Sequence, residues 1–248
     1  MPEGDAIHRV AQALRVLEGE VVTASSPHPR AALTGVAERI DGRRLERVEA
    51  VGKHLLLTFE GGTVVHSHLR MQGRWRVERA GRPIGGKPWL ILRGGEWQAV
   101  QRRGPVLAVG RGRTDRLGPD IMSSPPDLDG MVERFRSGDQ RRALGEAVLD
   151  QRLVAGIGNM WKAESLFAAR LSPWARLEDL ADEELRGALA VAASMMQAPR
   201  SRGRSVYRRA GRPCRRCGTS IRSWPQGDDA RMAYWCPSCQ GGTEPPRA

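Results

Sequence analysis

The feature that most constrains the fold of this chain is its set of four cysteines, which form two pairs near the C-terminus. Cys214 and Cys217 make one C-x-x-C pair, Cys236 and Cys239 make the other, and the 248-residue chain has no further cysteine. Each pair closes a tight turn with both sulfurs on one side, so two facing pairs form a four-sulfur cage that suits Zn²⁺. A redox motif or two disulfides are the alternatives, but neither pair enters a helix in a βαβ context. We therefore predict one structural zinc ion.

The residues around the two pairs predict a zinc ribbon. Tyr234 and Trp235 precede the second pair and suit a short strand of a β-hairpin. Gly218 follows the first pair and suits a tight turn that points backbone N–H groups at a thiolate. Four zinc-bound thiols fit a reducing cytoplasm.

The positive charge of the chain is concentrated beside these cysteines. Residues 201–248 hold ten arginines against three carboxylates, and the whole chain has a formal net charge of +12. Such a charge predicts a polyanionic partner, nucleic acid in preference to a membrane. The chain has no run of about 20 apolar residues and no charged-then-apolar signal pattern at its start. The alternative is a composition in which arginine is abundant everywhere.

The pattern of apolar residues divides the chain into three parts, residues 1–122, 123–200 and 201–248. The first opens with a helix in which Ile7, Ala11 and Leu14 recur at helical spacing, and Asp5 and Gly19 can cap its two ends. Short alternating runs separated by glycines follow and predict a β-sandwich or barrel. We expect strands at Leu45–Val51, His54–Phe59, Thr63–His68, Gly73–Val77, Trp89–Leu92, Trp97–Gln101 and Val106–Val109.

The second part follows a Pro-rich segment, residues 123–127, and is predicted to be helical. We expect helices at Met131–Arg136, Leu144–Asp150, Met160–Leu171 and Glu183–Ala198. A turn of small residues ending in Asn159 separates the second helix from the third. Such a turn brings backbone N–H groups and the asparagine close to a phosphate, although tight helix packing explains it equally well.

Four segments of the chain, in order, resemble the Fpg/Nei family of DNA glycosylase/AP lyases. They are Met1–Gly4 (MPEG), Gly52–Leu57 (GKHLLL), Gly156–Asn159 (GIGN) and Arg231–Gln240 (RMAYWCPSCQ). Shorter agreements at 67–73 and 116–120 extend the resemblance over nearly the whole chain, and the opening resembles the endonuclease VIII (Nei) branch. The resemblance implies an α+β, multidomain protein. Its parts are a catalytic β-sandwich with an N-terminal helix, a helix-two-turn-helix DNA-binding domain and a basic zinc-finger hairpin with four cysteine ligands.

The chemistry expected of such an enzyme needs an amine nucleophile. An α-amino group with a pKa of ~7.8 is deprotonated at neutral pH far more often than a lysine at ~10.4. Removal of Met1 would expose the secondary amine of Pro2 as this nucleophile. The alternative is that Pro2 is an ordinary proline at the first position of a helix. The resemblance assigns Glu3 as the proton donor and Lys53 as a phosphate or proton handler. It assigns Arg231 the role of binding the phosphate that leaves in δ-elimination, and a guanidinium group suits that role.

The resemblance also indicates which residues hold the DNA. Arg70, Arg116 and Asn159 are expected to contact it, and Met71 is expected to enter the duplex when the target nucleotide leaves the stack. The alternative for Met71 is a core residue at the end of a strand. Arg70 is expected to face the orphaned opposite base.

Two features of the sequence affect the functional expectation. Ala6 stands where family members commonly carry a carboxylate, so any supporting role falls to Asp5 or is absent. The segment from Pro199 to Cys214 is short, whereas enzymes of the Fpg type that recognise 8-oxoguanine tend to carry a longer loop there. This favours oxidised pyrimidines as substrates.

We therefore expect a monomeric, bifunctional DNA glycosylase/AP lyase that acts on damaged DNA in the bacterial cytoplasm or nucleoid, with no membrane partner. The alternatives are an 8-oxoguanine-directed glycosylase of the Fpg type, a lyase that has lost base excision, and a non-catalytic DNA-binding protein. Pro2 and Glu3 are both intact, which favours an enzyme over the binding protein.

Overall fold

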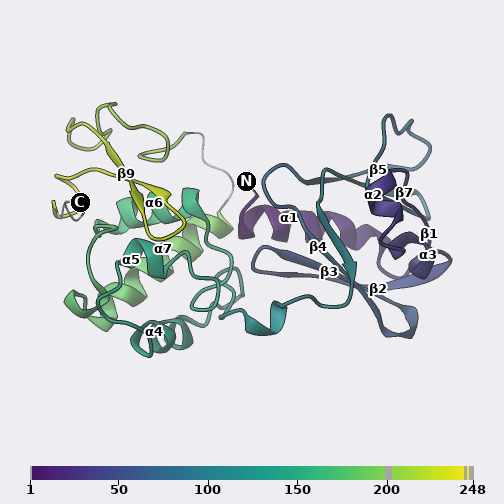
Figure 1. The fold of residues 1–248 in the computed structure, drawn as a ribbon, viewed down its shortest axis with the longest axis horizontal. Coiled ribbons are helices and arrows are strands. Elements are labelled where there is room, and N and C mark those ends of the chain that lie inside the picture. The colour runs from purple at the N-terminus through teal and green to yellow at the C-terminus, as the bar shows by residue number, and fades with distance from the viewer. Residues whose placement is uncertain (1, 199–202, 243–244, 246–248) are drawn as a thin grey trace. The chain divides into compact units, whose positions relative to one another are not determined.

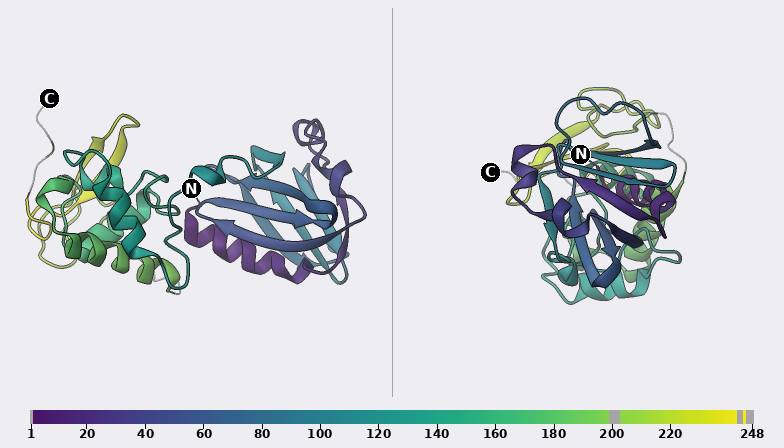
Figure 2. Two further views of the ribbon diagram at one scale, coloured as in Figure 1. Left: turned by 90° about the horizontal axis from the view of Figure 1, so that it is seen from below. Right: turned by 90° about the vertical axis from the view of Figure 1, so that its right-hand side faces the viewer.

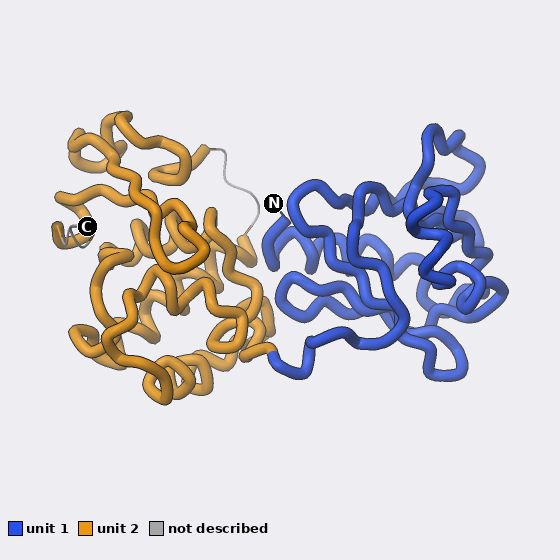
Figure 3. Tube along the Cα trace, viewed as in Figure 1, with its two compact units in different colours: residues 1–116 blue, residues 117–248 orange. Residues whose placement is uncertain are grey.

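The computed structural model describes residues 2–198, 203–242 and 245, and these residues form two compact units. Unit 1 comprises residues 1–116 and unit 2 comprises residues 117–248 (Figure 3). Met1, the predicted boundary at Pro199–Ser201, and two of the ten C-terminal arginines, Arg202 and Arg247, lie outside the described residues. The predicted division into three domains stays a prediction.

Unit 1 begins with helix α1, Gly4–Leu14, whose apolar face packs on the strands that follow. Ile7, Ala11 and Leu14 are buried at the predicted helical spacing. The prediction that Asp5 caps the start of this helix was wrong. Asp5 lies inside the first turn, and its carboxylate pairs with Arg9 one turn later. The position before the helix is occupied by Glu3 in extended conformation.

Eight antiparallel strands form the β-sandwich of unit 1 (Figure 1 and Figure 2). They run in the order β5-β7-β6-β1-β2-β3-β4-β8, and β1 pairs with both β6 and β2, so it joins the two halves. The bounds are β1 Val21–Ser25, β2 Arg43–Val51, β3 His54–Phe59, β4 Thr63–His68, β5 Arg74–Arg79, β6 Leu90–Gly94, β7 Trp97–Arg102 and β8 Val106–Val109. Buried apolar residues from both halves share one core, which extends to α1.

Short helical segments complete unit 1. They are η1 Arg15–Leu17, α2 Pro29–Ala32, α3 Val36–Ile40, η2 Glu60–Gly62 and η3 Thr114–Arg116. The sequence prediction missed α2, α3 and β1. Of the five residues of β1 only Val22 is buried, so its apolar alternation is weak.

Unit 2 combines a helical core with a two-stranded hairpin. Its elements are α4 Leu128–Arg136, α5 Leu144–Ala147, α6 Asn159–Ala169, η4 Leu177–Asp179, α7 Asp182–Gln197, β9 Arg222–Gln226 and β10 Arg231–Trp235. Helix α5 is shorter than predicted, because after Val148 the backbone changes to tighter bonds in which the N–H groups of Leu149 and Asp150 donate to the carbonyls three residues earlier. Among the described residues, no helix is both long and apolar enough to cross a membrane.

Candidate functional site

The first residues of the chain lie at the start of α1. Pro2 is half-buried, and Glu3 is 4% exposed with extended backbone angles. The carbonyl oxygen of Glu3 accepts the N–H groups of Ala6 at 2.9 Å and Ile7 at 3.2 Å, which fixes the chain where it enters the helix. A carboxylate beside the first turn also interacts favourably with the helix dipole.

Lys53 lies in the tight turn that connects β2 to β3. Val51 and His54 are paired across this hairpin, so Gly52 and Lys53 are its only loop residues. Gly52 has a φ of +57°, which a glycine adopts readily at the first position of a two-residue hairpin loop. The turn therefore presents Lys53, half-buried, just before the apolar strand β3, as the sequence predicted.

The loop between β4 and β5 presents Met71 to solvent. Leu69 is buried and its carbonyl accepts the N–H of Gly73 at 2.8 Å, so the loop is closed at its base. A Cβ at Gly73 would lie 2.5 Å from that carbonyl oxygen, which excludes other residues there. Arg70 has a φ of +50° at the tip, and Met71 is 61% exposed. The alternative of a core role for Met71 is therefore wrong.

Three histidines that sequence reasoning missed cluster beside this loop and Lys53. His54 Nδ1 lies 2.7 Å from His66 Nε2, and the His54 ring stacks on His66 and meets His68 edge-on. His68 Nδ1 accepts the backbone N–H of Arg70 at 3.1 Å. The signal was present in the sequence, because His66 and His68 alternate on β4 opposite the start of β3.

The histidine cluster is uncharged near neutral pH. Burial, together with the neighbouring histidines, Arg70 and Lys53, lowers the pKa of His54 to about 4. Burial and the Arg70 charge also lower the pKa of His68 to about 4. Burial lowers the pKa of His66 as well. The cluster therefore braces the loop without adding positive charge.

Asn159, a predicted site residue, contacts the strand of unit 2 that carries Arg231, another predicted site residue. Gly156, with a φ of +105°, turns the chain into α6, and Asn159 is the first residue of that helix. Its Nδ2 donates to the carbonyl oxygen of Met232 at 2.9 Å, next to Arg231 on β10. The Arg231 side chain is 48% exposed and has a long ion pair of 3.9 Å with Asp229.

Arg116 belongs to unit 1 and not to this hairpin. It is the last residue of η3 and is exposed, and its backbone N–H donates to the carbonyl of Arg113 at 3.2 Å.

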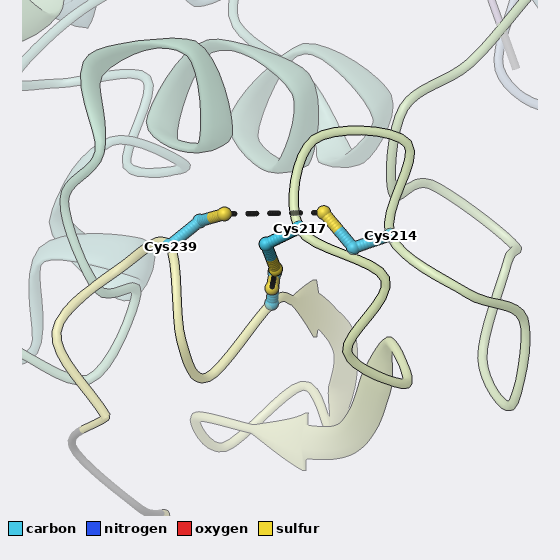
Figure 4. A group of neighbouring side chains, drawn as sticks. Cys214, Cys217 and Cys239 are labelled. Atoms are coloured by element: carbon cyan, nitrogen blue, oxygen red, sulfur yellow. Dashed lines mark hydrogen bonds between the residues drawn. The ribbon is translucent and has the colours of Figure 1, made fainter.

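The four cysteines form a cage that can hold a metal ion (Figure 4). The Sγ atoms of Cys214 and Cys239 are 3.9 Å apart, and those of Cys217 and Cys236 are 3.5 Å apart. Tetrahedral ligation at ~2.3 Å separates sulfurs by about 3.8 Å, so these distances suit zinc and exclude a disulfide. The N–H of Arg216 points at Cys214 Sγ, 3.4 Å away, as expected for a turn that favours thiolate.

The cage also shows how a metal would change the protonation of the thiols. Hydrogen bonds from Thr219 lower the pKa of Cys217 to about 6, whereas burial raises the pKa of Cys239 to about 12. Without a cation, the four sulfurs would therefore not be deprotonated together at neutral pH. A divalent cation supplies the charge that four thiolates need.

Comparison with known proteins gives family matches over most of the chain. The formamidopyrimidine-DNA glycosylase N-terminal domain matches residues 1–93, and the formamidopyrimidine-DNA glycosylase H2TH domain matches residues 117–209. The probable endonuclease 8 2 of Streptomyces coelicolor is 39% identical over 269 residues, covering 99% of this chain and 96% of the relative. The DNA-(apurinic or apyrimidinic site) lyase Nei2 of Mycolicibacterium smegmatis is 35% identical over 261 residues, covering 97% and 99%.

The fold agrees with a solved structure of the same family. The formamidopyrimidine-DNA glycosylase of Lactococcus lactis, non-covalently bound to DNA containing an AP site, aligns with a TM-score of 0.79 at 21% identity. The alignment covers 96% of this chain and 99% of that one. It confirms the predicted α+β architecture of sandwich, helical domain and cysteine hairpin. By the two domains and the full-length relatives, the chain belongs to the Fpg/Nei family, in its endonuclease 8-like (Nei-like) branch.

Proposed function

We propose that this chain is a bifunctional DNA glycosylase/AP lyase of base excision repair. It removes an oxidised base and then cuts the strand at the abasic site. The observation that carries the proposal is the likeness of nearly the whole chain to relatives named endonuclease 8 and AP lyase. The intact Pro2-Glu3 pair at the entry to α1 supports the same chemistry.

In this mechanism the secondary amine of Pro2, exposed after removal of Met1, attacks C1′ of the damaged nucleotide. A bond from nitrogen to C1′ forms, the glycosidic bond breaks, and the base leaves with its bonding electrons and takes up a proton. Glu3 protonates the ring oxygen as the C1′–O4′ bond breaks, which leaves a cationic Schiff base.

The Schiff base then allows two eliminations. Loss of a C2′ proton expels the 3′ phosphate by breaking the C3′–O bond, and loss of a C4′ proton expels the 5′ phosphate by breaking the C5′–O bond. Lys53 holds a phosphate or moves a proton in the first elimination, and Arg231 binds the phosphate that leaves in the second. Water then hydrolyses the imine and frees Pro2.

DNA binding in this proposal uses the exposed loop of unit 1 and the α6 turn of unit 2. Met71 fills the space left by the flipped nucleotide, for which its exposure at the loop tip is the support. Arg70 faces the opposite base, while Arg116 and Asn159 contact phosphates. We propose oxidised pyrimidines as the main substrates because the segment from Pro199 to Cys214 is short.

The remaining expectations complete the proposal. Cys214, Cys217, Cys236 and Cys239 bind one zinc ion, which is structural because four thiolates leave no open coordination position. The chain acts as a monomer on damaged DNA in the bacterial cytoplasm, with domains at residues 1–122, 123–200 and 201–248.

A second candidate function, an AP lyase without base excision, is favoured by Ala6 and by the relative named a lyase.

A panel of duplexes distinguishes these candidates. Protein from which Met1 has been removed is incubated with DNA carrying 5-hydroxyuracil, 8-oxoguanine or an abasic site, and strand cleavage is measured on denaturing gels. The proposal predicts cleavage at 5-hydroxyuracil and at the abasic site, with less at 8-oxoguanine. Cleavage at the abasic site alone would establish the second candidate instead, and preference for 8-oxoguanine would contradict the pyrimidine assignment.

A further inference from the structure

Helix α6 carries a lysine in the interior of unit 2, where lysines are rarely found. Lys162 is 1% exposed, and its Nζ donates to Oε1 of Gln226 at 3.3 Å. An ammonium group is enclosed in this way only if polar partners replace its water. Helix α6, which carries Lys162, packs against β10 of the hairpin (Figure 1), and the contact with Gln226 on β9 holds Lys162 at a defined point.

Gln226, the partner of Lys162, is fixed from several sides. It is 4% exposed, and its Nε2 donates to the carbonyl oxygen of Pro173 at 2.8 Å while its oxygen faces Lys162. A Cβ at Gly145 would lie 2.3 Å from Oε1 of Gln226, so the backbone of α5 closes the remaining space. The amide group thus has one orientation that satisfies both its donor and its acceptor.

Gln226 is also the direct cross-strand partner of Arg231. The register of the hairpin places the two residues opposite each other at the end of β9 and the start of β10. On the next residue of β10, the carbonyl of Met232 accepts from Asn159, which lies three positions before Lys162 on α6. The first turn of α6 therefore anchors both strands of the hairpin at the level of Arg231.

Among the residues that the structure describes, little else fixes the Arg231 side chain. Its ion pair with Asp229 is 3.9 Å long and exposed, and such pairs contribute little. Its position follows from the backbone of the hairpin, which α6 holds.

We infer that Lys162 and Gln226 are positioning residues for Arg231 and thereby control the second elimination. This inference rests on the proposed function, in which Arg231 binds the phosphate that leaves when the C5′–O bond breaks. Removal of the Lys162–Gln226 contact lets the start of β10 shift while the residues of unit 1 are untouched. Schiff-base formation and the first elimination then continue, and δ-elimination slows.

The test is the product ratio on abasic-site DNA under single-turnover conditions. The first elimination leaves an unsaturated aldehyde at the 3′ end and the second leaves a 3′ phosphate, and gels separate the two. Lys162→Met keeps the length of the side chain and removes its donor. We expect δ-elimination to fall about tenfold or more relative to β-elimination, since small misplacements have effects of this size. Borohydride trapping and zinc content stay unchanged.

Three further variants complete the test. Gln226→Leu removes both hydrogen bonds and should behave like Lys162→Met, whereas Gln226→Glu keeps an acceptor for Lys162 and should retain more δ-elimination. Glu178→Gln, on the exposed surface of unit 2, serves as the matched control and should leave the ratio unchanged. A simple loss of folding would reduce trapping and zinc content in all hairpin variants alike and would contradict a positioning role.

Arg231→Ala separates failure of this inference from failure of the proposed function. If Arg231→Ala abolishes δ-elimination while Lys162→Met and Gln226→Leu leave the ratio unchanged, the inference is wrong and the role of Arg231 stands. If Arg231→Ala itself leaves the ratio unchanged, the proposed role of Arg231 is wrong and the inference is overturned with it.

Discussion

The place of Met71 in the structure excludes one of its two interpretations, that of a core residue. Its sequence neighbours allow either the end of a core strand or a side chain that enters DNA, and it is exposed at the tip of a closed loop. Leu69 and Gly73 hold the base of that loop, so the apolar tip is presented on a defined scaffold. An exposed methionine suits insertion because its side chain adapts to irregular spaces.

Replacement of Met71 by alanine should reduce base excision from duplex DNA by about tenfold, which corresponds to roughly 1.4 kcal/mol. The truncated side chain no longer fills the vacated stack, so the flipped state is less populated. Single-stranded substrate should be affected much less, because it has no stack to hold open. Excision rates on matched single-stranded and duplex 5-hydroxyuracil substrates check this, with Met71→Leu as the control. An equal loss on both substrates would argue against insertion.

The histidine cluster gives unit 1 a predictable dependence on pH. The pKa of His54 and of His68 is about 4 in the folded protein, below the usual 6.5 of an unfolded chain. Between these values the unfolded chain binds more protons, so stability falls as pH drops from 6.5 towards 4. Melting temperatures across this range check the prediction. Substituting His54 and His68 by asparagine should flatten the decline, and an unchanged slope would contradict the assignment.

At the scale of elements, sequence periodicity predicted strands with clear alternation and missed those without it. Strands β3, β4 and β8 have the predicted bounds, whereas β1, with a single buried residue, was not recognised. Apolar periodicity also does not predict local backbone hydrogen bonding, such as the tighter bonds of Leu149 and Asp150 that follow the end of α5. The anchoring of the hairpin by Lys162 depends on a contact between residues 64 positions apart, which no local pattern reveals.

The cysteine hairpin is the element with the simplest functional test. Removal of metal by a strong zinc chelator should unfold the ribbon and abolish δ-elimination, because Arg231 lies on β10 of the same hairpin. Zinc content by atomic absorption and the product ratio should fall together and recover when zinc is restored. Full δ-elimination by protein shown to be free of metal would refute the structural role.

At the scale of the whole molecule, the proposed chemistry draws on both compact units. Pro2, Glu3 and Lys53 belong to unit 1, and Asn159, Arg231 and the four cysteines belong to unit 2. The net charge of +12 suits a polyanionic partner for the whole chain. Sequence reasoning found the cysteine cage from spacing alone, since metal geometry dictates that spacing. It proposed Pro2 and Arg231 as site residues only through family resemblance, because neither residue has a distinctive local pattern.

The most direct test of the central claim is borohydride trapping of the Schiff base on Pro2. Protein freed of Met1 is incubated with 5-hydroxyuracil duplex and sodium borohydride, and the crosslinked peptide is identified by mass spectrometry. We predict a covalent complex attached at Pro2, and none with Pro2→Gly or with protein that retains Met1, although both still bind DNA. A crosslink at a lysine, or normal strand cleavage by the protein that retains Met1, would contradict the account.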